Sequence, residues 1–405
     1  MQIPLTVMQE INNMNNIRIG IIGVGNMGSA HANCIGNGEI EGMVLTAVCD
    51  IDPKRTEKYI ENGSGIAVFQ NYEELLRSKV VDAVLIAVPH RLHATIAMEA
   101  LQAGLHVLLE KPIDIRVSLA ERLNEAAEKS GKVFGIMFNQ RTNSLFQKAR
   151  EIVQSGQLGE LKRSVWIVTN WYRTQRYYDS GDWRATWAGE GGGVLLNQAP
   201  HNLDLWQWIC GMPVSVTGYC DVAKYHDIEV EDDATIFVRY ANGATGTFIT
   251  STGEYPGTNR LEISGDLGKL VLENGVLKHW RLKQSEREVC RMSEKGMPKL
   301  EYEYTEIVQE GREAAHKGIL QNFANAILHD EVLLAPGVEG IRELILSNAA
   351  YLSSWQGNQE IILPFESAQF DVLLAEKQAS PVWRDEEIRE AKETIEYKDR
   401  WKVNW

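Results

Sequence analysis

The chain has 405 residues, of which 44% are hydrophobic and 24% charged, a balance typical of a folded globular protein. This length is enough for two or three domains of roughly 150 residues each. Its 41 Lys and Arg residues and 55 Asp and Glu residues give a formal net charge of −14, which disfavours nucleic acid and anionic membrane surfaces as partners. The charge does not exclude an anionic small molecule.

The five cysteines are dispersed, and none forms a C-x-x-C pair or a zinc-type cluster with histidine. Such a set predicts unpaired thiols, a cytoplasmic location and no metal site. Residues 1–16 lack the basic and apolar regions of a signal peptide, so we expect a flexible leader. No apolar run reaches the roughly 18 residues that a membrane span needs.

Residues 17–22 form a predicted buried strand, which leads into G-x-G-x-x-G at 23–28 and then into a helical stretch. In this context the glycines are typical of a dinucleotide-binding turn. They allow a tight turn, close approach of the pyrophosphate and close helix–strand packing. Backbone N–H groups at the start of the helix then face the phosphates.

The next predicted strand ends at Asp50, about 20 residues beyond the glycine turn, where an acidic residue hydrogen-bonds the adenosine ribose diol. A carboxylate there repels a 2′-phosphate, so the sequence favours NAD over NADP. Lys54 and Arg55 could weaken that preference. The alternative is that Asp50 only begins the next turn.

Two further predicted strands end in candidate site residues. Residues 80–88 lead to Pro89, His90 and His93, at the edge of the sheet where ligands bind in open α/β folds, although His93 could equally pack on the following helix. Another strand ends in Glu110 and Lys111. Lys111 could bind a substrate hydroxyl and stabilise alkoxide charge, or transfer a proton if burial lowers its pKa. Glu110 could hold its ammonium group.

The predicted fold class is an α/β Rossmann domain, a doubly wound parallel sheet over 17–141, followed by an α+β domain over 142–365. Strands without intervening helices, with Asn-Gly turns at 242–243 and 274–275, predict a large, open, mostly antiparallel sheet. We expect its exposed face to form a homo-oligomer, a dimer or tetramer. The extension 366–405 is expected to pack on the body or on a neighbouring subunit.

Aromatic and basic residues are dense between 170 and 187. Aromatic rings stack on sugar faces, and Arg, Asn and Gln hydrogen-bond hydroxyl or acidic groups. The alternative is a packed loop that covers the domain junction.

Three consecutive glycines, 191–193, precede Asn197, His201 and Asp204. If helical, these three polar residues share one face, which suggests a catalytic helix with His201 at its centre. Pro200 requires that the helix begin near Gln198 or kink there. We expect Asp204 to position the helix or His201.

Taken in order, the glycine turn, the Glu-Lys-Pro segment and the triple glycine followed by His201 resemble the Gfo/Idh/MocA family over 17 to about 365. The family is named after glucose–fructose oxidoreductase, inositol dehydrogenase and rhizopine catabolism. The resemblance implies an active site between the two domains, and oxidation or reduction of a hydroxyl on a sugar, polyol or glycoside with NAD(P). Lys111 and His201 match the family's catalytic residues. Asn197 stands where members commonly carry Asp, and it can orient a hydroxyl but cannot exchange a proton.

The predicted site residues fall into three groups. The catalytic residues are Lys111 and His201. The substrate-binding residues are Asn197, Arg141, Trp171, Tyr172, Arg173 and Arg184. The cofactor-binding residues are Gly23, Gly25, Asn26, Met27, Gly28, Asp50, Pro89, His90, His93, Glu110, Lys111, Asn139, Arg184 and Trp187.

Three functions are consistent with these residues. The first is NAD-dependent hydride transfer at a ring hydroxyl, with His201 as base and Lys111 stabilising the alkoxide. The second is a glycosidase that oxidises its substrate transiently, eliminates the aglycone and returns the hydride. The third is a sugar-sensing regulator without catalysis, against which Lys111 and His201 argue.

Overall fold

The computed structural model describes residues 16–61, 65–181, 183–309, 311 and 313–380. Nearly all of the predicted leader, and the extension beyond 380, lie outside these residues. Contacts divide the chain into two compact units. The first contains the chain up to 114 with 119–139 and 314–341, and the second contains 115–118, 140–313 and the chain from 342 onward.

A six-stranded parallel sheet forms the core of the first unit, in the order β3-β2-β1-β4-β5-β6. Its strands are β1 (Ile17–Ile22), β2 (Met43–Cys49), β3 (Ala67–Phe69), β4 (Ala83–Ile86), β5 (His106–Leu109) and β6 (Phe134–Ile136). These short apolar runs are buried at the centre of the sheet, where Ile19, Leu85 and Val107 have no exposed surface. This order is that of dinucleotide-binding folds and confirms the predicted doubly wound sheet.

The helices of the first unit follow the strands, apart from one that returns from far along the chain. They are α2 (Asn26–Gly36), α3 (Pro53–Glu61), α4 (Tyr72–Arg77), α5 (His93–Gln102), α6 (Val117–Ser130) and α12 (Ala315–His329), with short 3₁₀ turns η1 (His90–Leu92) and η3 (Gly337–Glu339). The segment after α12 reaches edge strand β6, where Ile136 N donates to Ala335 O at 3.0 Å. Residues 314–341, which fall within the second domain predicted over 142–365, thus pack with the first unit.

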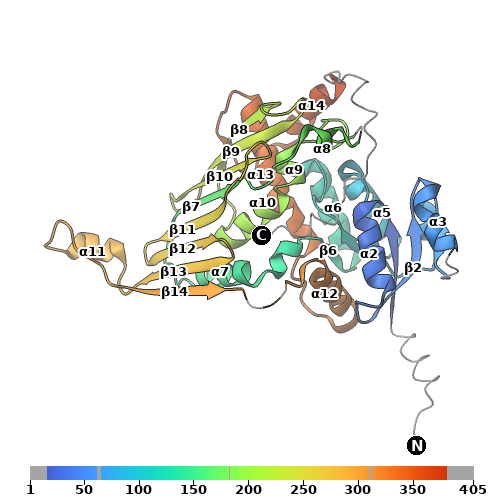
Figure 1. Cartoon of the computed structure of the whole chain (residues 1–405), viewed down its shortest axis with the longest axis horizontal. Coiled ribbons are helices and arrows are strands. Elements are labelled where there is room, and N and C mark those ends of the chain that lie inside the picture. The colour runs from blue at the N-terminus through green and yellow to red at the C-terminus, as the bar shows by residue number, and fades with distance from the viewer. Residues whose placement is uncertain (1–15, 62–64, 182, 310, 312, 381–405) are drawn as a thin grey trace, which may run out of the picture. The chain divides into compact units, whose positions relative to one another are not determined.

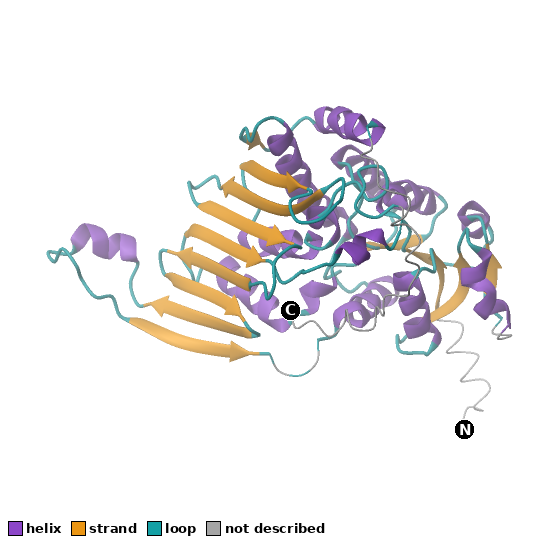
Figure 2. Cartoon of the chain, turned by 45° about the horizontal axis from the view of Figure 1, so that its top comes forward, coloured by secondary structure: helices purple, strands orange, loops and turns teal. Residues whose placement is uncertain are grey.

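A nine-stranded sheet forms the second unit, in the order β14-β13-β12-β11-β7-β10-β9-β8-β15 (Figure 2). Its strands are β7 (Leu161–Val168), β8 (Ser215–Val222), β9 (Glu231–Arg239), β10 (Thr245–Ser251), β11 (Asn259–Gly265), β12 (Gly268–Glu273), β13 (Val276–Leu282), β14 (Tyr302–Val308) and β15 (Ile361–Ile362). Neighbouring strands are antiparallel except β7 and β10, which confirms the mostly antiparallel prediction. Asn274 and Gly275 both have positive φ, as a tight hairpin turn requires.

Helices lie along one face of this sheet (Figure 1). The helices of the second unit are α7 (Ser144–Gln154), α8 (Gln175–Asp179), α9 (Val194–Asn197), α10 (Pro200–Cys210), α11 (Glu286–Met292), α13 (Gly340–Trp355) and α14 (Ser367–Ala379). Helices α7, α9 and α10 contact the strands, and Ser353 of α13 accepts from Gly218 N of β8. On the opposite face, side chains such as Ile167, Phe237 and Ile249 are half-buried.

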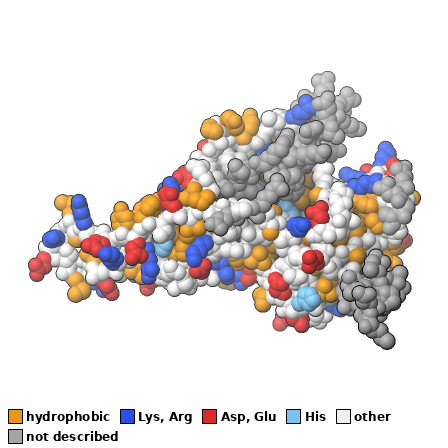
Figure 3. All heavy atoms as spheres, turned by 60° about the horizontal axis from the view of Figure 1, so that its bottom comes forward, with side chains coloured by type: hydrophobic (Ala, Val, Ile, Leu, Met, Phe, Trp, Pro, Cys, Tyr) orange, Lys and Arg blue, Asp and Glu red, His pale blue; other side chains and the backbone are white. Residues whose placement is uncertain are grey.

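The end of the second unit that carries α11 and β14 presents interspersed acidic and basic side chains (Figure 3). Lys283 and Glu301 form one of its ion pairs, at 2.6 Å, and Arg287 with Glu160 forms another. In the described part of the chain, no helix is long and apolar enough to cross a membrane. All five cysteines are unpaired.

Candidate active site

The glycine turn of the first unit is sterically restricted to glycine at two positions. Gly23 has φ +88°, and a Cβ there would lie 2.5 Å from Ala87 O. A Cβ on Gly28 would lie 1.8 Å from Gly23 O, so the first turn of α2 packs directly on the end of β1. Gly25 is the N-cap of α2, and no side chain caps this helix in the described structure. Its first backbone N–H groups therefore suit a phosphate, as NAD requires.

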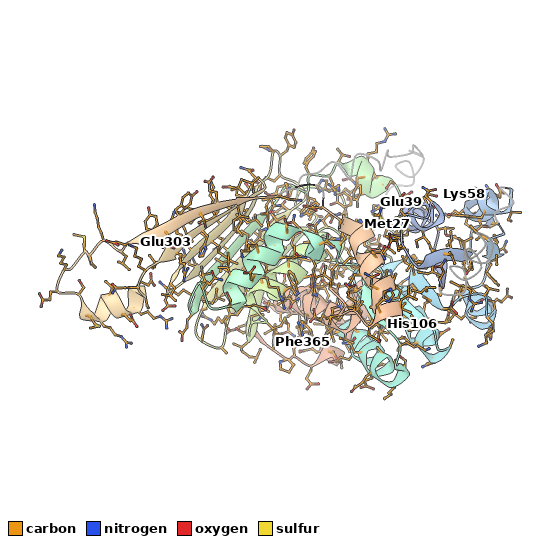
Figure 4. The ribbon with its side chains drawn as sticks, turned by 90° about the horizontal axis from the view of Figure 1, so that it is seen from below. Met27, Glu39, Lys58, His106, Glu303 and Phe365 are labelled. Atoms are coloured by element: carbon orange, nitrogen blue, oxygen red, sulfur yellow. The ribbon has the colours of Figure 1, made fainter. Side chains whose placement is uncertain are left out.

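The first turn of α2 itself carries no negatively charged side chain. Asn26 is exposed, and Met27 is half-buried. Figure 4 labels Met27 on α2 and Lys58 on the neighbouring helix α3. The ammonium of Lys58 donates to Ser29 Oγ at 3.3 Å, which ties α3 to α2.

Asp50 lies directly after β2 and is buried. Its Oδ2 accepts from Val24 N at 2.9 Å and its Oδ1 from Asp52 N at 3.0 Å. The Arg55 guanidinium lies 3.6 Å from the same carboxylate. These backbone donors hold the carboxylate beside the glycine turn, where a ribose would have to reach it. Ribose binding by Asp50 stays a prediction.

The segment after β4 brings together an exposed Pro89, a half-buried His90 and a buried His93. The His93 ring bridges two backbone carbonyls, with Nδ1 2.7 Å from Pro112 O and Nε2 2.8 Å from Val88 O. Burial lowers the pKa of His93. This geometry makes His93 a link between the β4 rim and the Glu-Lys-Pro turn, and does not support the predicted direct cofactor contact.

Glu110 is paired with a histidine that the sequence reading missed. His31 of α2 places Nε2 2.8 Å from Glu110 Oε1, and both side chains are buried. Burial by itself would raise the pKa of Glu110, but the hydrogen bond and charge of His31 lower it to about 2. Glu110 thus stays ionised beside Lys111.

A second histidine, His316 of α12, lies near the same pair. Its ring centroid is 5.6 Å from that of His31, and its Nδ1 is 3.4 Å from the Nδ2 of Asn139. Burial lowers the pKa of His316 to about 4. His31 could have been found from its place one turn after Gly28 on the strand-facing side of α2. No sequence signal connects His316 to this turn.

The triple glycine of the second unit brings the backbone against β9 and α13. A Cβ on Gly193 would lie 1.8 Å from Glu231 O, and one on Gly192 would lie 2.3 Å from Tyr351 Oη. The buried Glu231 carboxylate accepts from Gly193 N at 2.9 Å, Leu195 N at 2.9 Å and Tyr351 Oη at 2.7 Å. Burial raises the pKa of Glu231 to about 7 despite these three donors. Glu231 is a further residue that the sequence reading missed.

The stretch after the glycines is two helices, so the interpretation of one helical face through residues 197, 201 and 204 is wrong. Asn197 ends α9, and Pro200 is the first residue of α10, where its missing N–H removes no helical hydrogen bond. His201 lies in the first turn of α10 and is 9% exposed. The Asn197 amide donates to the Glu190 carboxylate.

Arg141 and Asp204 form a buried, two-pronged ion pair. Arg141 Nε lies 2.8 Å from Asp204 Oδ2, and Nη2 lies 2.7 Å from Oδ1. Their side chains are 0% and 1% exposed, and the guanidinium lies 5.1 Å from the Trp208 ring. Asp204 therefore positions α10, as expected. This burial does not support a substrate contact by Arg141.

The aromatic loop is anchored from within the second unit. Trp171 is buried and Tyr172 is 47% exposed. Arg173 Nη1 donates to the carbonyls of both, at 3.0 and 2.9 Å, and Arg173 O lies 2.9 Å from His226 Nε2. The other ring nitrogen of His226, Nδ1, lies 2.8 Å from Asp232 Oδ2.

Tyr177, one of the aromatic residues of the predicted loop, connects this loop to the turn between α9 and α10. Its hydroxyl accepts from Arg184 Nη1 at 2.8 Å and from Gln198 Nε2 at 3.3 Å. The Arg184 guanidinium also lies 4.5 Å from the Tyr177 ring centroid, and Arg184 is 8% exposed. Arg184 thus braces the loop.

Trp187 belongs to an aromatic cluster and is 5% exposed. Its ring contacts Tyr351 and Trp355 of α13, and Trp355 stacks on Phe370 of α14 at 5.3 Å. This packing does not support the predicted cofactor contact of Trp187. It also shows that α14, the described start of the C-terminal extension, packs on α13. Among the described residues, no group of His, Cys, Asp or Glu could hold a metal ion.

Two models of one protein family match the chain. The model described as "Oxidoreductase family, NAD-binding Rossmann fold" matches residues 17–138, and the GFO/IDH/MocA C-terminal domain matches residues 146–271. Together they cover more than half of the chain.

Curated relatives and solved structures agree with these matches. Myo-inositol 2-dehydrogenase of Thermotoga maritima is 26% identical over 266 residues, which cover 64% of this chain and 75% of the relative. Inositol 2-dehydrogenase of Corynebacterium glutamicum is 34% identical over 200 residues, which cover 49% of this chain and 56% of the relative. The WlbA dehydrogenase of Bordetella pertussis, crystallised with NADH and UDP-GlcNAcA, is 26% identical with a TM-score of 0.73, and the match covers 87% of this chain and all of that one.

Proposed function

Because the chain belongs to the GFO/IDH/MocA family of oxidoreductases with an NAD-binding Rossmann fold, we propose that it oxidises or reduces a ring hydroxyl of a sugar, polyol or glycoside. NAD supplies the hydride acceptor or donor when it is bound. The observation that carries the proposal lies in the first unit. The glycine turn after β1 and the Glu-Lys-Pro turn after β5 both follow the carboxyl ends of strands in one parallel sheet, and that edge is where ligands bind in such sheets.

Each proposed catalytic residue is supported by the way its own unit holds it. His201 removes the proton of the reacting hydroxyl, Lys111 stabilises the developing alkoxide, and Asn197 orients the neighbouring hydroxyl. Glu110, ionised and tied to His31, keeps a negative charge next to Lys111 and so favours its ammonium form. The Arg141–Asp204 pair fixes the first turns of α10, on which His201 lies.

Two substrate chemistries follow from the relatives. Two of them are named for inositol, a cyclic polyol, and the WlbA structure holds a nucleotide-linked sugar acid. We propose a six-membered ring that bears adjacent hydroxyls as the common substrate feature. The partly exposed Tyr172 and Trp183 supply aromatic faces for such a ring.

The test is turnover by the purified chain with NAD and a panel of myo-inositol, UDP-GlcNAcA and simple glycosides, followed by the absorbance of NADH. The His201→Ala variant should lose about 10²- to 10⁴-fold in kcat, because it removes the general base, while NAD binding persists. His329→Ala, at an exposed position in the last turn of α12, is the matched control and should keep full activity. Unchanged turnover in His201→Ala would reject the role of His201.

The alternative is a redox-neutral glycosidase, and the aromatic loop over 170–187 favours it because such a loop suits a substrate with an aglycone. A glycosidase of this kind would retain tightly bound NAD and release sugar from a glycoside without net NADH. Net NADH formation from a free polyol would exclude it. NAD binding without turnover of any member of the panel would instead favour the regulator.

We also propose a cytoplasmic homo-oligomer that forms through the open face of the nine-stranded sheet. Half-buried apolar side chains on that face, among them Ile167, Phe237 and Ile249, support this surface. Light scattering should give a dimer or tetramer, and Ile249→Arg should reduce the mass to that of the monomer because it places a charge in the interface. A monomeric wild-type chain would overturn this part of the proposal.

A further inference from the structure

Glu190 is a buried carboxylate placed directly before the triple glycine, and its side chain connects two segments of the second unit. Glu190 is 1% exposed. One carboxylate oxygen accepts from Ala185 N at 2.7 Å, and the other accepts from the Nδ2 of Asn197. Its own backbone N donates to Thr186 O at 3.0 Å, so the carboxylate is anchored through both main chain and side chain.

This contact decides which way the Asn197 amide is turned. The two ends of an amide side chain have the same shape, but one is a donor and the other an acceptor. The Glu190 oxygen that faces Asn197 accepts from its NH₂ end. The carbonyl oxygen of Asn197 must then face away from Glu190.

We propose that Glu190 is a positioning residue that fixes Asn197 as a hydrogen-bond acceptor towards the substrate, which selects a substrate group that donates, namely a hydroxyl. The inference rests on the proposed function, in which Asn197 meets the hydroxyl next to the reacting one. It also explains why an amide suits position 197. An aspartate there would set two carboxylates against each other in a buried place, and like charges at such a distance repel.

Four proteins test this inference: the wild type, Glu190→Gln, Asn197→Asp and the double variant. Asn197→Asp alone should lower kcat/KM at least about 10-fold, because the two carboxylates repel. In the double variant the amide of the new glutamine donates to the new aspartate, and most of the loss should be recovered. Glu190→Gln alone holds Asn197 in either orientation, so it should raise KM several-fold and change kcat less.

A matched control separates this effect from general damage. Asn143 also donates its amide to a glutamate, Glu313, while its Oδ1 caps α7 by accepting from Leu145 N at 2.9 Å. Asn143→Asp keeps the cap and creates the same carboxylate pair elsewhere, so it should lower the unfolding midpoint and leave kcat/KM unchanged. If Asn197→Asp behaves like this control, or the double variant is no better than Asn197→Asp, the inference is overturned.

The same four proteins are unfolded in urea without substrate, which separates this inference from the proposed function. Recovery of the midpoint in the double variant supports the Glu190–Asn197 contact even if no substrate is turned over. Absence of turnover in the wild type overturns the proposed function and the substrate-facing part of the inference. Absence of recovery in the midpoint overturns the contact itself.

Discussion

The turn after β5 in the first unit and the triple-glycine turn in the second each contain a buried glutamate, and the two are held in opposite ways. Glu110 meets a histidine at 2.8 Å, and its pKa falls to about 2. Glu231 meets two backbone N–H groups and a tyrosine hydroxyl, and burial raises its pKa to about 7. The neutral donors around Glu231 thus do not offset its desolvation, whereas the interaction with His31, aided by His316 and Lys111, offsets that of Glu110.

The difference corresponds to two tasks. Glu110 stays charged next to Lys111. Glu231 instead holds backbone, since its carboxylate bridges the start of α9 to Tyr351 of α13. Inside the second unit, Asp204 is likewise paired with a basic side chain, that of Arg141. For Glu110 and Glu231, the kind of partner therefore sets the direction of the pKa shift.

The largest expected effect comes from removing the cation of a fully buried pair. Arg141→Met should lower the free energy of unfolding by about 3–5 kcal/mol, because Asp204 is left as a buried charge. Urea unfolding at neutral pH measures the loss. The double variant Arg141→Met with Asp204→Leu should recover most of it. If Arg141→Met lowers the free energy of unfolding no more than the loss of an exposed ion pair does, the expected effect of burial is contradicted.

The second largest effect is the pH dependence that Glu231 gives to the free energy of unfolding. Its folded-state pKa, about 7, lies above the ordinary value of 4.5, so the folded protein binds the proton more tightly than the unfolded chain does. Glu231 therefore lowers the free energy of unfolding as the pH rises from 4.5 to about 7, by on the order of 3 kcal/mol in all.

Glu231→Gln keeps one acceptor oxygen, as the protonated carboxyl does, and should remove this slope. Urea unfolding of both proteins across that pH range is the measurement. Parallel profiles for the wild type and the variant would show that Glu231 does not titrate there.

We expect Glu110 to change the free energy of unfolding with pH in the opposite direction. Its folded-state pKa, about 2, lies below 4.5, so its stabilisation is complete above pH 4.5 and is lost as the pH falls towards 2. His31→Phe removes the charge-assisted hydrogen bond and should cost about 1.5–3 kcal/mol at neutral pH. His31→Gln keeps a neutral donor and should cost less. Equal losses in the two variants would mean that the donor has no role.

The smallest effect is expected where the same kind of pair is exposed. Arg77 and Glu73 of α4 lie 3.0 Å apart, with side chains 71% and 50% exposed. Arg77→Ala should change the free energy of unfolding by only about 0.3–0.5 kcal/mol, because water solvates both charges. A loss comparable to that of Arg141→Met would show that burial is not what makes these pairs matter.

Local patterns were sufficient for most of the architecture. A strand, a glycine turn and a helix follow within 20 residues at β1 and α2, and the Asn274–Gly275 hairpin depends on the φ preference of its own two residues. The two sheets, the dinucleotide turn and the family follow from such short segments. The helix boundary at Pro200 needed the structure, because the sequence left open whether the helix kinks there or begins anew.

By itself, the sequence determined the parallel and antiparallel sheets, the glycine turn and the residues proposed for catalysis, since each depends on neighbours a few positions apart. Only the tertiary structure decided which buried groups meet. Glu110 contacts His31, which lies 79 residues away in the sequence. Asp204 contacts Arg141 across 63 residues, and Glu231 contacts Gly193 across 38 residues. Such pairings depend on how sheets and helices pack. Packing also sets how deeply each group is buried, and burial raises or lowers its pKa. This burial cannot be predicted from the composition or the spacing of residues.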